Sequence, residues 1–505
     1  MSLIGLDIGT TGCKCMIFDI EGNVQSFSYK EYSVEDCGQG QYELDPYKVW
    51  QAVKYVIYNA VKNNKGDNPI ALSVSSFGES ATPVDKNGNI LYNSILYTDN
   101  RGLEQSQKLL GKLEEIEIFK LTGVPVHPMY TINKVAWIKE NMPDIFNNTW
   151  KFMLFEDLII YFLTGTPMID YSLASRTMAF NVVKKEWEPV IFDIMGVDID
   201  IFSKVSHSGT IVGNIRESLA NELQLPPALV VVTGGHDQAC AALGAGILEE
   251  GQAVEGIGTA DCITTVFDKP ILNNEMLKSN FNCEPHALDE KYISLAFTLT
   301  GGALLKWYRN CFGREYTVEA IKNKMSVYKL LDEKAAKEPT DLIVLPHFSG
   351  SGTPYMDPMS KGAIIGLTLD STPSRLYRAL MEGVAYEMRY NIECLEKAGI
   401  QVRKLRAVGG GAKSDLWLQI KADITGKSIE TLNIDEAGTL AAAVIAGTAI
   451  GLYTSYESAV NKIVKAGKKF YPNPKHQEIY EVYYHRYKKT YKAVKSIYDI
   501  KEYDR

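Results

Sequence analysis

The chain has 505 residues, a formal net charge of −8 and 46% hydrophobic residues. Because it exceeds the roughly 250 to 300 residues at which a single hydrophobic core stops growing, we expect two or more domains. The acidic balance argues against a nucleic-acid binder, which needs a clustered basic surface, so a small molecule is the expected partner.

The N-terminal segment does not have the pattern of a targeting sequence. Its apolar run, Met1 to Leu6, is interrupted by Asp7 before it reaches the ~7 to 15 residues of a signal-peptide core. The sequence contains no run of ~18 apolar residues that would suggest a membrane span. The eight cysteines form no CxxC pair and no zinc spacing. We therefore predict a cytoplasmic protein with reduced thiols and no membrane partner.

The first predicted element is a β-hairpin whose strands lie near 3–6 and 15–18. Its turn combines glycines for close backbone approach with hydroxyl groups and a cation, as a phosphate loop requires. The GxxxxGK[ST] spacing of a Walker loop is absent, and an ordinary hairpin turn is the alternative interpretation. The candidate phosphate ligands are Thr10, Thr11 and Lys14, and Asp7 is a candidate for a hydrated Mg²⁺.

Helical and strand patterns alternate after this hairpin, which indicates a mixed α/β fold. Helical spacing occurs at 49–61, around Tyr161, and at 239–245. The turn sequence at 85–89 predicts a second hairpin between runs near 72–74 and 95–97.

An apolar run at 229–232 leads into Thr233-Gly234-Gly235-His236-Asp237-Gln238. This order places Asp237 between the end of a strand and the start of a helix. There Asp237 either caps the helix or, in a nucleotide cleft, accepts a proton from the hydroxyl that attacks the γ-phosphate. His236 is expected to pack or to form a hydrogen bond.

The hairpin turn recurs about half a chain length later. Residues 8–13, IGTTGC, reappear in part at 257–262 as IGTADC, and Phe-Asp follows at 18–19 and again at 267–268. Chance matching of two strand-turn-strand units is the alternative. We predict two related domains, 1–245 and 246–505. Two facing Gly-Thr turns would clamp a polyphosphate, an arrangement that resembles the actin, Hsp70 and sugar-kinase superfamily with its ribonuclease H-like domains and central cleft.

Two further glycine clusters lie in the second half. Gly409-Gly410-Gly411-Ala412-Lys413-Ser414 follows an apolar run and precedes a helical pattern, which suits a nucleotide site, a Rossmann turn or a tight structural loop. Gly301-Gly302 opens a helical run at 303–309. Helical spacing also occurs at 376–395, and the Tyr- and Lys-rich stretch 480–501 is predicted to form a solvated helix.

Two longer segments resemble the signatures of the FGGY carbohydrate kinases. Residues 129–141, MYTINKVAWIKEN, match one family pattern completely. Residues 362–382 match the other except at Arg375, where the family usually has an uncharged amide, His or an acid. The resemblance covers nearly the whole chain and implies an enzyme that uses ATP and Mg²⁺ to phosphorylate a small sugar or sugar acid.

The resemblance also implies roles for particular residues. Asp237 would be the general base, with Asp7 and Asp237 at the metal and Thr10, Thr11 and Lys14 at the phosphates. The second phosphate loop would be Gly258 and Thr259, the nucleotide site would include Gly301, Gly410, Gly411 and Ser414, and the sugar site would include Glu79, Asp99 and Arg101. Asp261 departs from the family pattern and is expected to place an acid beside the phosphates.

The sugar itself is less clearly indicated. Segments 122–129 and 170–175 look most like gluconate kinases of the family, but Glu79 stands where gluconate and xylulose kinases carry Met-His and glycerol kinases carry Glu. We expect gluconate, with xylulose or a polyol as the alternative. An actin- or Hsp70-like ATPase and a dinucleotide-dependent oxidoreductase are the competing classes, Asp99 and Arg101 could instead form a surface ion pair, and a homodimer is left open.

Overall fold

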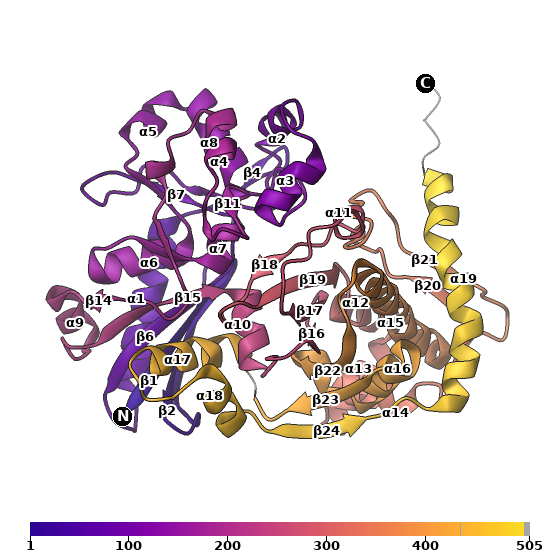
Figure 1. The fold of residues 1–505 in the computed structure, drawn as a ribbon. Helices are drawn as coiled ribbons and strands as arrows, with labels where there is room; N and C mark the ends of the chain where they lie inside the picture. Colours follow the sequence, from indigo (N-terminus) through magenta and orange to yellow (C-terminus); the bar gives the residue numbers. More distant parts are fainter. Residues whose placement is uncertain (435, 499–505) are drawn as a thin grey trace.

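The computed structural model describes residues 1–434 and 436–498. It contains two large mixed sheets, one from each half of the chain, and a helical lobe above the first sheet (Figure 1). Within these ranges no helix is both long and apolar enough to cross a membrane.

The first sheet gathers three loops at one edge. Its strands, in spatial order, are β14 (Ile211–Asn214), β15 (Val230–His236), β6 (Pro69–Ser76), β1 (Ser2–Ile8), β2 (Gly12–Asp19) and β3 (Val24–Glu31). The predicted first hairpin is confirmed, since β1 and β2 pair antiparallel. Because β1, β6 and β15 run parallel, Ile8 and His236 both lie opposite Ser76. The loops that follow these three strands therefore meet.

The second sheet repeats this topology. Its strands, in spatial order, are β18 (Glu284–Pro285), β19 (Tyr292–Thr298), β17 (Asp261–Phe267), β16 (Gly251–Ile257), β22 (Val402–Val408), β23 (Ser428–Leu432) and β24 (Ala466–Phe470). The order β19-β17-β16-β22-β23 matches β3-β2-β1-β6-β15, with the same parallel and antiparallel pairings. The predicted duplication is therefore present in the fold, and the loops after β16 and β22 meet at one edge.

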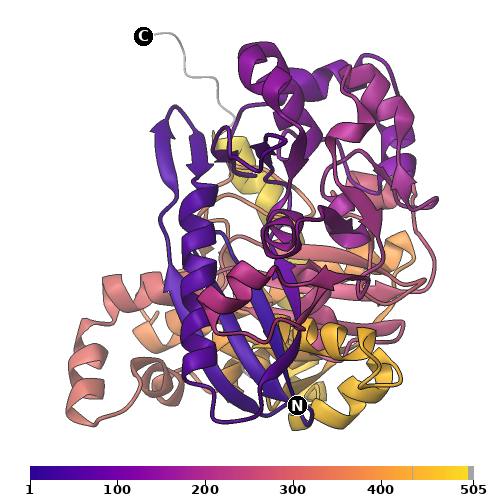
Figure 2. The ribbon, with the colours of Figure 1, turned by 90° about the vertical axis from the view of Figure 1, so that its left-hand side faces the viewer.

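Helix α1 (Pro46–Lys62) shows how local sequence builds a cover for the first sheet. Asp45 caps it by accepting hydrogen bonds from the backbone N–H groups of Tyr47 and Lys48, and Pro46 occupies the first helical turn. Its buried residues recur every three or four positions, and the helix packs against β2 and β3. Figure 2 shows α1 running along the strands of this sheet.

Two helices from different parts of the chain pack closely beside the first sheet. Helix α10 (Asp237–Gly244) lies between the halves, while α17 (Ala437–Ala449) and α18 (Tyr456–Ile463) lie against the first sheet although they come late in the sequence (Figure 1). A Cβ atom on Gly5 or Gly244 would lie 1.9 Å from a backbone oxygen of α17, so both positions need glycine. The division into domains 1–245 and 246–505 stays a prediction, since α17 and α18 return to the first sheet.

The helical lobe corrects the second predicted hairpin. A turn does form at 85–89, but it joins β7 (Thr82–Val84) to a bridge at Ile90. Strand β6 already has β1 and β15 on its two sides, so no edge of β6 is open to a hairpin partner. Residues 94–95 form β8 (Ser94–Ile95) and pair instead with β5 (Gln41–Leu44).

The remaining elements complete the lobe and the outer layers. The lobe contains α2 (Leu103–Leu110), α3 (Glu115–Thr122), α4 (Thr131–Asn141), α5 (Pro143–Asn148), α7 (Tyr171–Ser175), α8 (Pro189–Met195) and β9 (Lys151–Met153). Helix α6 (Phe155–Thr164) packs against β6 and β15 of the first sheet. Helix α9 (Glu217–Leu223) lies beside α1. The second half carries α11 (Asn274–Lys278), α12 (Gly302–Phe312), α13 (Arg314–Lys322), α14 (Val327–Lys334), α15 (Pro373–Ala398), α16 (Asp415–Thr425) and α19 (Pro474–Tyr498).

The C-terminal helix α19 is only partly solvated, which corrects the prediction for 480–501. Tyr480, Tyr484, Tyr487 and Tyr491 are buried on one face of it. These tyrosines join the core cluster of the second half, which also contains residues of α15. Their spacing of three and four residues is that of a helix face that packs on a neighbour. Residues 499–501 of the predicted stretch lie outside the described residues.

Candidate active site

A cavity with a volume of about 1110 Å³ lies beside the second predicted phosphate loop, in the second half. Its lining includes five of the predicted nucleotide residues, namely Gly258, Thr259, Gly410, Gly411 and Ser414. Gly301 lies just behind this lining, where its N–H donates to the Thr259 carbonyl at 2.8 Å. The volume and the glycine loops suit a nucleotide.

The local sequence explains the shape of this cavity. Gly409 has a φ of 88°, and a Cβ there would lie 2.9 Å from the Ile257 carbonyl oxygen, so only glycine fits between β22 and the turn that follows it. Ser414 then caps α16 by accepting a hydrogen bond from the backbone N–H of Trp417 at 3.1 Å. The strand-turn-helix predicted around Gly409 is confirmed.

Asp261 does not lie beside the phosphate positions, contrary to the expectation from its place in the sequence. Its side chain is fully buried and pairs with the ammonium of Lys421, which also donates to Glu255 at 2.6 Å. Burial raises the pKa of both Asp261 and Glu255, and the nearby ammonium opposes this shift. A buried ion cluster therefore joins β16 and β17, the two strands that flank the second predicted phosphate loop.

The first phosphate loop lies at the edge of the first sheet, as predicted. Thr10 is half-buried and Thr11 is exposed. Lys14, which lies opposite Asp7 across the β1–β2 ladder, forms a 2.8 Å ion pair with Glu436 at the start of α17. The ammonium of Lys14 thus remains near the loop but is shared with a carboxylate from late in the chain.

Asp237 begins α10, and its side chain is about one-third exposed (34%). Burial, with a further contribution from the charge of Asp237, raises the pKa of Asp7 to about 6, although Ser75 donates to Asp7 at 2.8 Å. Two carboxylates that repel each other at the end of parallel strands suit a cation. No group of three or more His, Cys, Asp or Glu side chains gathers as a metal site in the described ranges. A Mg²⁺ ion would therefore need oxygen ligands from phosphate or water as well.

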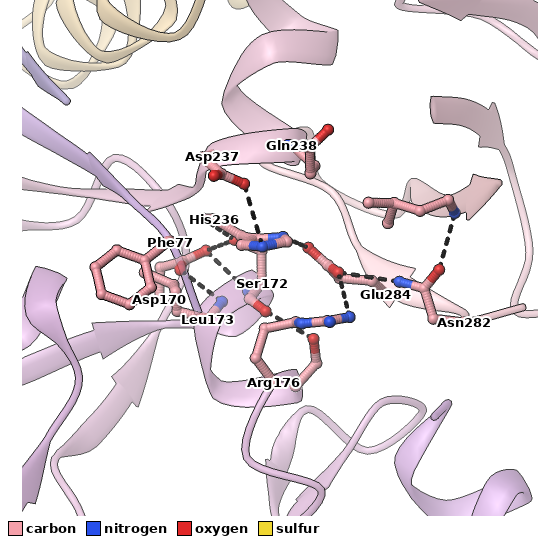
Figure 3. Close-up of polar contacts among 12 residues, drawn as sticks. Phe77, Asp170, Ser172, Leu173, Arg176, His236, Asp237, Gln238, Asn282 and Glu284 are labelled. Atoms are coloured by element: carbon pink, nitrogen blue, oxygen red, sulfur yellow. Dashed lines mark hydrogen bonds and ion pairs between the residues drawn. The ribbon is translucent and has the colours of Figure 1, made fainter. Parts of the chain in front are cut away.

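A chain of ion pairs leads from Asp237 through His236 and Glu284 to Arg176 (Figure 3) and from there to Glu79. The Nε2 atom of His236 lies 3.2 Å from Asp237, and Nδ1 lies 2.7 Å from Glu284. The other oxygen of Glu284 accepts from Arg176 at 3.3 Å, and Arg176 donates through Nε to Glu79 at 2.7 Å. Burial alone would lower the pKa of His236, but the charges of Glu284 and Asp237 raise it to about 9.

The backbone of the segment that carries Asp237 is fixed by buried acids that the sequence did not single out for this role. The backbone N–H of His236 donates to Ser172 Oγ at 2.8 Å, and that hydroxyl donates to Asp170 at 2.7 Å. The N–H of Gly234 donates to Glu156 at 2.7 Å. Ser172 and Asp170 were noted only for their likeness to gluconate kinases, and here they support the loop that carries Asp237.

Tyr97 is a further residue that the sequence did not single out for function. Burial raises the pKa of Tyr97, the side chain of Thr10 opposes this shift, and the carboxylates of Glu79 and Asp237 act in the same direction as burial. Tyr97 is therefore electrostatically coupled to two of the predicted site carboxylates.

Asp99 and Arg101 are brought together, but in a closed and buried arrangement. Arg101 donates from Nε and Nη2 to Asp99, and Nη1 donates to Glu43 at 2.7 Å. Lys134 of α4 donates to the backbone carbonyl of Asp99 at 2.6 Å. The exposed fractions of Asp99 and Arg101 are 2% and 7%. This closed and buried geometry is that of a structural ion cluster, and their direct contact with a sugar stays a prediction.

Two family models cover most of the chain. The N-terminal domain of the FGGY family of carbohydrate kinases matches residues 2–244, and its C-terminal domain matches residues 256–450. The chain belongs to the FGGY family of carbohydrate kinases. It is therefore a carbohydrate kinase, and the resemblance found in the sequence is confirmed.

Individual relatives agree with this assignment. A xylulose kinase of Staphylococcus epidermidis is 30% identical over 98% of this chain and 97% of its own length. A gluconokinase of Bacillus subtilis is 28% identical over 91% of this chain and 90% of its own length. A crystal structure of ligand-bound xylulose kinase from Lactobacillus acidophilus superposes with a TM-score of 0.89, at 26% identity, over 98% of this chain and 99% of the other.

Proposed function

We propose that this FGGY kinase transfers the γ-phosphoryl group of ATP to a hydroxyl of a neutral ketose, with xylulose as the first candidate. The observation that carries the choice of a neutral sugar is the pairing of the cations near Asp237. Arg176 is bound by Glu79 and Glu284, and His236 lies between Glu284 and Asp237. A sugar carboxylate would have to compete with these carboxylates, whereas a neutral hydroxyl would not.

Names of relatives support the same choice. The first five relatives compared are xylulose kinases with 26 to 30% identity to this chain. The likeness of two short segments to gluconate kinases, and the gluconokinase relative at 28% identity, keep gluconate as the competing substrate. The likeness at 170–175 concerns Asp170 and Ser172, which hold the backbone of the segment that carries Asp237, so it carries less weight than the charges around Asp237.

In the proposed reaction the side chain of Asp237 accepts the proton of the sugar hydroxyl as that oxygen attacks the γ-phosphorus. The exposed third of Asp237 is available for this contact, while His236 holds its Oδ1. The backbone N–H groups of the two Gly-Thr loops and the ammonium of Lys14 would stabilise the charge on the phosphates. Mg²⁺ would supply further charge stabilisation, held by Asp7 and Asp237.

The two phosphate loops belong to different halves, so substrate binding is expected to bring the halves together and exclude water. The charge of Asp237 acts on Asp7 in the first half and on Cys262 in the second. This position between the halves suits a base that acts only when both are close.

The test is ADP release with xylulose, ribulose, gluconate and glycerol as acceptors. We expect kcat/KM for xylulose to exceed that for gluconate at least roughly tenfold, as one charge-assisted contact would give. Asp237→Asn should lower kcat by ~10² to 10⁴. A higher kcat/KM for gluconate would overturn the neutral-sugar assignment, and a folded Asp237→Asn variant with normal turnover would remove Asp237 from the mechanism.

A further inference from the structure

Glu284 reaches the catalytic edge of the first half from the second sheet. It lies in the edge strand β18, where it pairs with Ile293 of β19. Its carboxylate is fully buried, and its partners at this edge are His236 and Arg176 of the first half (Figure 3). The sequence around Glu284 contains no motif that would predict this role, because its partners are far away in the sequence.

One oxygen of Glu284 orients the base. Oε1 lies 2.7 Å from Nδ1 of His236, and Nε2 of the same ring lies 3.2 Å from Asp237 Oδ1. The two nitrogens of an imidazole are fixed relative to each other, so a partner on one sets the direction of the other. The position of Glu284 therefore determines where the His236 ring meets the carboxylate of Asp237.

The other oxygen acts on the sugar side. Oε2 accepts from Arg176 at 3.3 Å, and Arg176 in turn holds Glu79. Asn282 donates to the same oxygen at 3.1 Å, while its own carbonyl accepts the backbone N–H of Leu295 at 2.8 Å. Asn282 thus ties the Glu284 carboxylate to β19 and restricts its movement.

We propose that Glu284 is a positioning residue that holds two sets of side chains in a fixed arrangement. The base arm consists of His236 and the proposed base Asp237. The sugar arm consists of Arg176 and Glu79. This inference rests on the proposed role of Asp237. Three donors face the two oxygens of Glu284, His236 at one and Arg176 and Asn282 at the other, so the site requires a group that only accepts hydrogen bonds. Glutamine offers one acceptor and one donor and would leave one of the two arms without its partner.

The experiment compares steady-state kinetics of the wild-type chain and Glu284→Gln with xylulose and ATP. We expect kcat to fall roughly 10- to 100-fold, as a small misplacement of a catalytic group does, with KM for ATP within about twofold of the wild-type value. The matched control is Glu382→Gln. Glu382 is also fully buried and pairs with an arginine, Arg378, at 2.7 Å, but on α15 in the core of the second half. It should lower the melting temperature without lowering kcat.

A kcat of folded Glu284→Gln within twofold of wild type, or an equal loss in Glu382→Gln, would overturn the proposal. If Glu284→Gln does not fold, Asn282→Ala keeps the carboxylate and removes only its anchor. That variant should lower kcat several-fold with KM for ATP unchanged, and an unchanged kcat would overturn the proposal. Asp237→Asn is measured in parallel. If it remains active the proposed function fails, whereas an inactive Asp237→Asn beside a normal Glu284→Gln rejects the positioning role alone.

Discussion

Lys421 holds Asp261 away from the phosphate edge by pairing with it in the buried core beneath the second phosphate loop. The same ammonium lies 2.6 Å from Glu255, so one cation balances two buried carboxylates. A complete buried ion cluster of this kind changes the free energy of unfolding little. Removing one partner lowers that free energy strongly, because it leaves an uncompensated buried charge.

Lys421→Met should therefore destabilise the protein by roughly 3 to 5 kcal/mol, because Glu255 and Asp261 would lose the cation that they share. Urea denaturation followed by circular dichroism would measure this loss. Adding Glu255→Gln to Lys421→Met should recover part of it, since one buried charge is then removed. A loss below about 1 kcal/mol in the single variant would show that the ammonium is not needed.

Lys14→Ala should lower kcat/KM for ATP roughly 10- to 100-fold, the range expected for one charge-assisted contact. Stability should change little, because Lys14 and Glu436 are both about one-third exposed (31% and 35%) and such pairs contribute at most about 1 kcal/mol. Glu436→Gln is the control. It frees the ammonium and should leave kcat/KM for ATP at or above the wild-type value, so equal losses in both variants would contradict a phosphate role for Lys14.

The local structure of the segments predicted to bind the nucleotide could be read from the sequence because its signals are local, while their contact with a nucleotide stays a prediction. The Gly-Thr turn near Thr10, its copy near Thr259 and the glycine cluster at Gly410 each lie within a few residues of a strand end. Asp237 was likewise placed correctly between a strand and a helix start, and its role as the base stays a prediction. These segments adopt the predicted local structure because a glycine turn and a helix start depend on residues that are neighbours in the chain.

The sugar side could not be predicted in the same way, because its contacts join distant segments. Arg176 meets Glu79 and Glu284 only after the lobe and the second sheet have packed. Asp261 was expected at the phosphates, but its direction depends on Lys421, which lies 160 residues away. The prediction of a hairpin between 72–74 and 95–97 was wrong for the same reason, since β6 pairs with the distant strands β1 and β15.

Glu79→Gln should change substrate preference rather than abolish activity. Glu79 neutralises part of the charge of Arg176, to which it is bound by two donor nitrogens. With that charge removed, Arg176 would attract a sugar acid more strongly, so the ratio of kcat/KM for gluconate to that for xylulose should rise roughly tenfold. Glu43→Gln removes one of the two carboxylates that pair with Arg101. A larger rise in that variant would assign carboxylate recognition to Arg101 instead, and no change in either would reject charge as the basis of selection.

Asp157→Asn should raise stability at neutral and mildly alkaline pH. Burial raises the pKa of Asp157 to about 8, although Ser203 donates to it. The unfolded carboxyl loses its proton near pH 4, so between pH 4 and pH 8 the wild-type unfolded state is progressively favoured. Asparagine does not titrate, and the difference in melting temperature should therefore be small near pH 4 and largest near pH 8. A difference that is constant over this range would contradict the shifted pKa.

The position of α17 and α18 sets an order for folding during synthesis. These helices pack with Leu3, Met16 and Phe18 in one apolar cluster beside the first sheet. A nascent chain released as far as residue 245 has made every strand of that sheet, yet it still lacks the helices that cover this apolar face. The first half can therefore be completed only after about nine-tenths of the protein has left the ribosome, and until then the cell must keep an exposed apolar surface from associating with other chains.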